Sequence, residues 1–159
     1  MPVAVSVSIA EAVKAMLASA AISQAIAPER SYADWELALD GGDALHIDVV
    51  AVTTEQKTEL SSRGTNRFLI PVDIAVRKRL GPDKQDDDTG RVKVDEVDAL
   101  CLLVEEIHEL FAPHRLSDFD AGVWQENKIL ACPLLTHLKG MRQFTGIVRV
   151  TFRVDKAVA

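Results

Sequence analysis

The chain has 159 residues, of which 48% are hydrophobic, and a formal net charge of −6. This size and composition predict a single domain over residues 1–159 with an ordered core at 8–154. The acidic balance argues against a protein that grips nucleic acid through a basic surface. Because no apolar run reaches the roughly 18 residues of a membrane span, we also expect no membrane association.

The first predicted element is a helix that begins at Ser8. Ser8 and Glu11 have the spacing of a capping box, and Ile9, Val13 and Leu17 then fall on one face. Pro28 excludes any helix that would continue through it. We therefore expect one amphipathic helix near the amino end.

Two short alternating segments, 32–39 and 45–51, predict an antiparallel hairpin. The turn at 40–43 contains two glycines, which tolerate the positive φ of tight turns. The polar stretches 53–66 and 81–93 are interpreted as mobile loops, and the first is alternatively an extended hairpin tip.

The clearest strand patterns lie at 67–80 and 143–154. In both, apolar residues occupy the even positions and polar residues most of the odd ones, which is typical of strands with one buried face. In the second segment, Gly146 and Ile147 do not follow the alternation of apolar and polar residues. These two strands need a covering layer.

A second helix follows the loop at 81–93, with Asp95 as its cap and an apolar stripe that runs to Phe111. A strand with a bend or bulge is predicted within 121–135, and Pro133 marks its end. Residues 155–159 form a tail. The order of elements predicts an α+β fold, with an antiparallel or mixed sheet of four to five strands and two main helices packed on one face.

Residues suited to chemistry are present but not in the required patterns. The metal-ligand candidates are His46, His108, His114, His137, Cys101 and Cys132. They lack paired short spacings, so we expect no metal or other cofactor, and we interpret both cysteines as buried thiols in a reducing cytoplasm. The run from Asp83 to Asp88 lacks the ligand spacing of a calcium loop. We predict no enzyme.

Four arginines lie on the polar positions of the two strong strands: Arg77, Arg79, Arg149 and Arg153. Two interpretations remain open. They form a solvated sheet face, or they meet the helix carboxylates Glu105, Glu106 and Glu109 of a neighbouring subunit. Under the second interpretation, charge reversal at Arg77 or Arg149 weakens assembly more than it weakens the folded subunit.

Several segments resemble small head–tail joining proteins of tailed phages and prophages. The resemblance rests on ERSYADWELAL at 29–39, LHIDVVAV at 45–52, PVDIAVRKRL at 71–80, DALCLLVEEI at 98–107 and RQFTGIVRVTFRV at 142–154. It covers most of residues 8–154 and is greatest for the tail terminators.

The resemblance implies a virion protein that is made in the bacterial cytoplasm and forms a ring, commonly a hexamer, on the last ring of the tail tube. It implies contacts with other copies of the chain, with the major tail tube protein and with a head-side connector, and a lumen through which the genome passes unbound. We expect partner or lumen contacts from loop residues Glu55, Lys57, Arg63, Asp83, Asp86, Asp87 and Asp88. The alternatives are another neck component, such as a head-closure or minor tail protein, and a small cytoplasmic enzyme or binding module.

Overall fold

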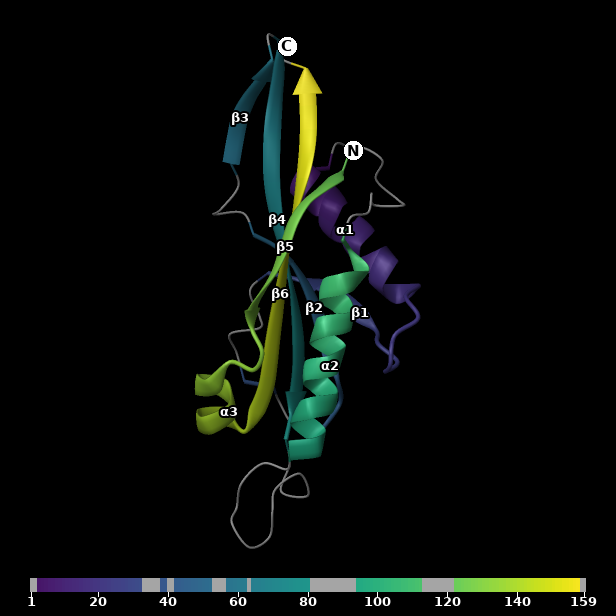
Figure 1. The fold of residues 1–159 in the computed structure, drawn as a ribbon, viewed down its shortest axis with the longest axis vertical. Coiled ribbons are helices and arrows are strands. Elements are labelled where there is room, and N and C mark those ends of the chain that lie inside the picture. The colour runs from purple at the N-terminus through teal and green to yellow at the C-terminus, as the bar shows by residue number, and fades with distance from the viewer. Residues whose placement is uncertain are drawn as a thin grey trace, which may run out of the picture.

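The structure, a computed structural model, describes residues 3–32, 38–39, 42–52, 57–62, 64–80, 94–112 and 122–157, with only the backbone for 60–62. These residues form three helices and a mixed six-stranded sheet, which confirms the predicted α+β class (Figure 1). The elements are α1 (Val5–Ala18), β1 (Pro28–Ser31), β2 (His46–Ala51), β3 (Lys57–Ser62), β4 (Thr65–Arg79), α2 (Val94–Leu110), β5 (Val123–Ala131), α3 (Leu135–Met141) and β6 (Gln143–Ala157).

The sheet is built around β4 and β6. Its strand order is β1-β2-β4-β6-β5, and β3 pairs with β4 outside this path. Only β1 and β2 run parallel among the described strand pairs. β4 and β6 pair over 15 residues each, from Thr65 opposite Ala157 to Arg79 opposite Gln143. Such strands are about 50 Å long, whereas a compact sphere of this chain length is about 40 Å across.

One end of the long strand pair therefore extends past the helices as a narrow three-stranded projection (Figure 1). This ribbon arm consists of β3, Thr65–Leu69 of β4 and Arg153–Ala157 of β6. Its described side chains are exposed or half-buried, except that of Val154. The arm is stabilised mainly by backbone pairing and cross-strand contacts, because neither of its faces is fully covered.

The hydrophobic core lies between one face of the sheet and the two longer helices. Its members include Ile9, Val13 and Leu17 of α1, Leu100, Leu103, Val104 and Ile107 of α2, and Ile70, Val72, Ile74 and Val76 of β4. The even positions of β4 thus face the core, as the period of two predicts. α3 packs on the opposite face, where His137 Nδ1 lies 2.8 Å from Thr145 Oγ1 of β6.

Several predicted boundaries are wrong. α1 begins at Val5, so Ser8 lies inside it and does not cap it. Residues 57–62 form β3, whose antiparallel pairing with β4 agrees with the alternative of an extended hairpin and not with a mobile loop, and residues 155–157 extend β6 where a tail was predicted. Polar edge segments such as these are held by hydrogen bonds to β4, and an apolar alternation is not required for that pairing.

The predicted hairpin is not what the described residues form. β2 lies within the predicted segment 45–51, but its neighbour is β1 at Pro28–Ser31, and the two strands run parallel. Residues 33–37 and 40–41 lie outside the described part of the chain, and so does the second predicted loop at 81–93. The short helix α3 had no prediction, because seven residues are too few to show a helical period.

Gly146 marks the closest approach of α2 to the sheet. A Cβ built at this position would lie 2.5 Å from Cγ2 of Val104 and 3.1 Å from Cε1 of Phe144, both in buried residues. The apolar alternation of β6 is interrupted here because the helix leaves no space for a side chain.

Gly146→Ala should therefore lower the free energy of unfolding by about 1–3 kcal/mol, because overpacking shifts buried side chains. The measurement is urea denaturation followed by circular dichroism. Gly140→Ala in α3 is the matched control, since a Cβ there meets nothing within 4 Å. Equal midpoints for the two variants would show that α2 can move away from β6 without loss.

Candidate assembly surfaces

The polar face of the sheet carries two ion pairs within the chain. Arg77 Nε of β4 donates to Asp48 Oδ2 of β2 at 2.6 Å, and these residues are 6% and 7% exposed. Arg149 of β6 donates from Nε and Nη2 to the two carboxylate oxygens of Asp73 of β4, at 2.7 and 3.0 Å. The bidentate geometry is the strong form of this contact. Three neighbouring strands are thus joined by charge as well as by backbone hydrogen bonds.

These pairs change the interpretation of the predicted arginine surface. Arg77 and Arg149 bind carboxylates of their own chain, so neither needs a neighbouring subunit to supply a carboxylate, and an intersubunit role for them stays a prediction. Arg79 is exposed and makes no ion pair with a described residue. Arg153 lies 4.0 Å from Asp155 on the same strand. Of the four, Arg79 is the one most open to a neighbouring subunit.

The acidic side of α2 is also partly engaged. Glu106 Oε2 accepts hydrogen bonds from the backbone nitrogen and the hydroxyl of Ser23, at 3.2 and 2.6 Å. Glu105 and Glu109 are exposed. Because α2 covers the sheet face opposite to Arg77, the predicted arginine and glutamate sets do not meet within one chain. A contact between them in an assembly remains a prediction.

The ribbon arm carries its own charged contacts. Arg67 Nε lies 3.0 Å from Asp155 Oδ1 on the neighbouring strand, and this hydrogen bond lowers the pKa of Asp155. Lys156 Nζ lies 6.0 Å from the ring centroid of Phe68. These two side chains line a hollow of about 170 Å³ whose other wall is the first turn of α1. Lys57 is exposed on β3, whereas Glu55, Arg63, Asp83, Asp86, Asp87 and Asp88 lie outside the described residues.

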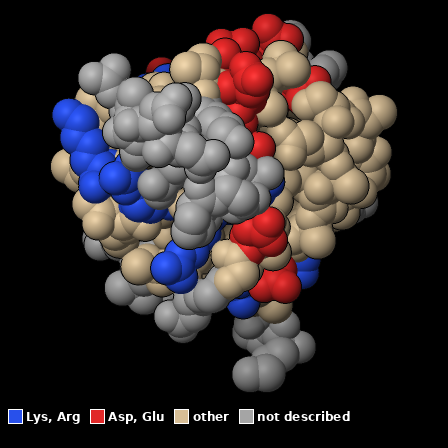
Figure 2. Space-filling model, turned by 90° about the horizontal axis from the view of Figure 1, so that it is seen from below, with Lys and Arg blue, Asp and Glu red and all other residues tan. Residues whose placement is uncertain are grey.

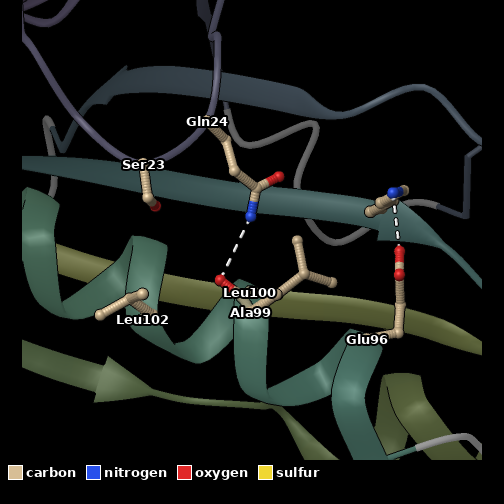
Figure 3. Close-up of a pocket in the computed structure, with 7 residues that line it drawn as sticks. Ser23, Gln24, Glu96, Ala99, Leu100 and Leu102 are labelled. Atoms are coloured by element: carbon tan, nitrogen blue, oxygen red, sulfur yellow. Dashed lines mark hydrogen bonds and ion pairs between the residues drawn. The ribbon is translucent and has the colours of Figure 1, made fainter.

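A cleft of about 240 Å³ lies between α2 and the segment that follows α1 (Figure 3). Its lining is Ser23, Gln24, Lys78, Glu96, Ala99, Leu100 and Leu102. Lys78 Nζ lies 2.7 Å from Glu96 Oε1, and Gln24 Nε2 donates to the carbonyl oxygen of Ala99 at 3.2 Å. Sequence reasoning missed this cleft because the residues that close it are 75 positions apart.

At the end of the molecule seen in Figure 2, Lys and Arg gather at the left and Asp and Glu gather at the top. Residues of both signs lie close together below the centre. On α2 the exposed carboxylates are Asp95, Asp98, Glu105 and Glu109. A surface divided in this way favours ordered contacts between charged proteins more than contacts with a uniform polyanion.

The described candidates for metal ligation do not form a site. Among the described side chains, no three His, Cys, Asp or Glu residues lie where they could hold one metal ion, and His114 falls outside that part of the chain. Cys101 and Cys132 are free thiols that pack against the core. Burial, together with the neighbouring Cys101 thiol, raises the pKa of Cys132 to about 12, so this thiol stays protonated at neutral pH.

Comparisons with known proteins give no family for the chain. Neither the known protein families nor the curated proteins contain a significant match to this sequence. Within the described ranges, no helix combines the length and the apolar character needed to cross a bilayer. The surfaces themselves must therefore carry the functional argument.

Proposed function

We propose that this chain is a structural subunit of a phage tail, a terminator that forms a ring at the head-proximal end of the tail tube. The ring stops tube growth and presents a surface to the head-side connector. The ribbon arm is the observation that carries the proposal. Where the 15-residue strand pair extends past its helices, the described residues leave most side chains exposed or half-buried and add no strand beyond β3, and an uncovered strand edge of this kind is a site for contact with another protein.

Charge supports the same assignment. The net charge of −6 lowers the affinity of the chain for a passing phosphate backbone, which suits a lumen that DNA must cross without arrest. Exposed Arg79 and the exposed carboxylates Glu105 and Glu109 lie on opposite faces of the sheet. A head-to-tail contact that repeats around a ring brings opposite faces of neighbouring subunits together.

The test is the length of tails made without this protein. Electron micrographs of particles lacking the gene product should show overlong tails without heads, and wild-type protein supplied in trans should restore normal tails. Light scattering with purified tail tubes should show that the mass of each tube rises by about 104 kDa, the mass of six copies of the 17.4-kDa chain, when the protein binds. Normal-length tails without heads would favour another neck component, and normal infectious particles would refute a role in the neck.

A further inference from the structure

β5 is an outer strand of the sheet, and the described residues add no strand to its second edge. Among the described residues, β6 is the only strand that pairs with it. Its pairing is regular from Glu126 to Ile129, between irregularities next to Trp124 and Ala131. Ile129 and Leu130 are 38% and 41% exposed, and an open edge with exposed aliphatic side chains is a template for another strand.

The charges on this edge lie on one face. Glu126 is opposite Thr151 of β6 and Lys128 is opposite Arg149, so both belong to the polar face of the sheet. Both are exposed, and neither makes an ion pair with a described residue. Lys128 stands opposite Arg149, whose guanidinium already holds Asp73, so no carboxylate of the described residues contacts the Lys128 ammonium.

A second copy of the same strand supplies a carboxylate. When two β5 strands pair antiparallel about Asn127, Glu126 of each copy stands opposite Lys128 of the other. Residues directly opposite in an antiparallel pair point to the same face, so both ion pairs form on the polar face. The two-fold contact is self-complementary: one patch meets itself, with opposite charges aligned twice.

We propose that in the free protein two copies join β5 to β5 about Asn127, so that one sheet continues across both subunits. The contact is short, and its area falls below the roughly 1,000 Å² of a stable interface, so the dimer is weak and sensitive to salt. A two-fold contact cannot link successive subunits of a polar ring. The dimer is thus a form of the free protein in which the edge is covered, and it stands independently of the proposed tail function.

Sedimentation equilibrium from about 0.01 to 1 mM protein at low salt tests the charge pattern, because weak interfaces of this size dissociate in that range. The wild type should approach a dimer of about 35 kDa, twice the mass of the 17.4-kDa chain. Lys128→Glu and Glu126→Lys should each raise the dissociation constant at least about fivefold, because two attractive pairs become two repulsive ones. The double variant Glu126→Lys/Lys128→Glu restores both pairs and should dimerise like the wild type.

The matched control is Lys57→Glu on β3, an exposed strand residue away from this contact, which should leave the dissociation constant unchanged. Thermal denaturation of each variant checks that the subunit stays folded. A wild type that remains monomeric throughout, single reversals without effect, or a double variant that stays dissociated would each overturn the proposal.

Cross-linking tests the register independently of charge. The two copies of residue 127 face each other at the two-fold axis with Cα atoms roughly 4.5–5.5 Å apart, within the range of a disulfide. Asn127→Cys should form an intermolecular disulfide under mild oxidation, whereas Lys57→Cys should not. Equal cross-linking of the two variants, or none at position 127, would rule out this pairing.

Discussion

Replacing Arg77 with alanine is expected to lower the free energy of unfolding by about 3–5 kcal/mol, because the change leaves a buried carboxylate without its partner. Asp48 is 7% exposed, and its Oδ2 accepts a hydrogen bond from Arg77 Nε at 2.6 Å. Urea denaturation of the folded subunit measures the loss. Arg79→Ala, two residues along the same strand on the same face, is the matched control. Arg79 is exposed without an ion pair to a described residue, and its removal should leave the midpoint almost unchanged.

A double replacement separates loss of the arginine from loss of the pair. Arg77→Met with Asp48→Leu removes both charges and keeps most of the volume, so its stability should return close to that of the wild type. An Arg77→Ala variant that loses less than about 1 kcal/mol would mean that water reaches Asp48 in the folded state.

The strand pattern predicts that charge reversal at Arg77 or Arg149 weakens assembly more than folding, whereas the two ion pairs predict an effect on the folded subunit. Both side chains instead hold carboxylates of neighbouring strands within the chain. Substitution at Arg77 should therefore act first on the folded subunit, and a test of assembly needs an exposed residue such as Arg79.

Phe152→Ala should cost a similar amount, about 3–5 kcal/mol, because it opens a cavity where β6 meets α2. Phe152 and Phe111 are fully buried, and their rings meet edge to face with centroids 6.3 Å apart and an interplanar angle of 81°. Thermal and urea denaturation should both show the loss. Phe68→Ala on the half-buried ribbon arm removes a ring of the same size and should cost clearly less. Comparable losses would indicate that the arm is as firmly packed as the core.

The two kinds of contact divide the molecule into parts with different roles. The ion pairs Asp48–Arg77 and Asp73–Arg149 join β2, β4 and β6, and the aromatic pair joins the sheet to Phe111, the residue that follows α2. The ribbon arm and β5 lie outside this frame. Substitutions on the ribbon arm and on the outer edge of β5 should therefore cost the fold little, because they leave these buried contacts intact.

Some of this was determined by the sequence alone. The alternation at 67–80 and 143–154 predicted the two central strands, and the stripe from Val97 to Phe111 predicted the main helix, because burial on one face imposes a period that the sequence displays directly. The α+β class followed from the order of these elements. The bend in the strand within 121–135 was also visible, and β5 has two register irregularities there.

The tertiary structure was needed to identify the ion-pair partners and the pairing of the polar edge strands. Polar residues at alternating positions look the same whether they face water or a carboxylate two strands away, so the interior pairs of Arg77 and Arg149 were not predictable. The strand character of residues 57–62 and 155–157 likewise depends on hydrogen bonds that β4 supplies. Pairing across the sheet is a property of the assembled fold, and local sequence carries little information about the partner strand.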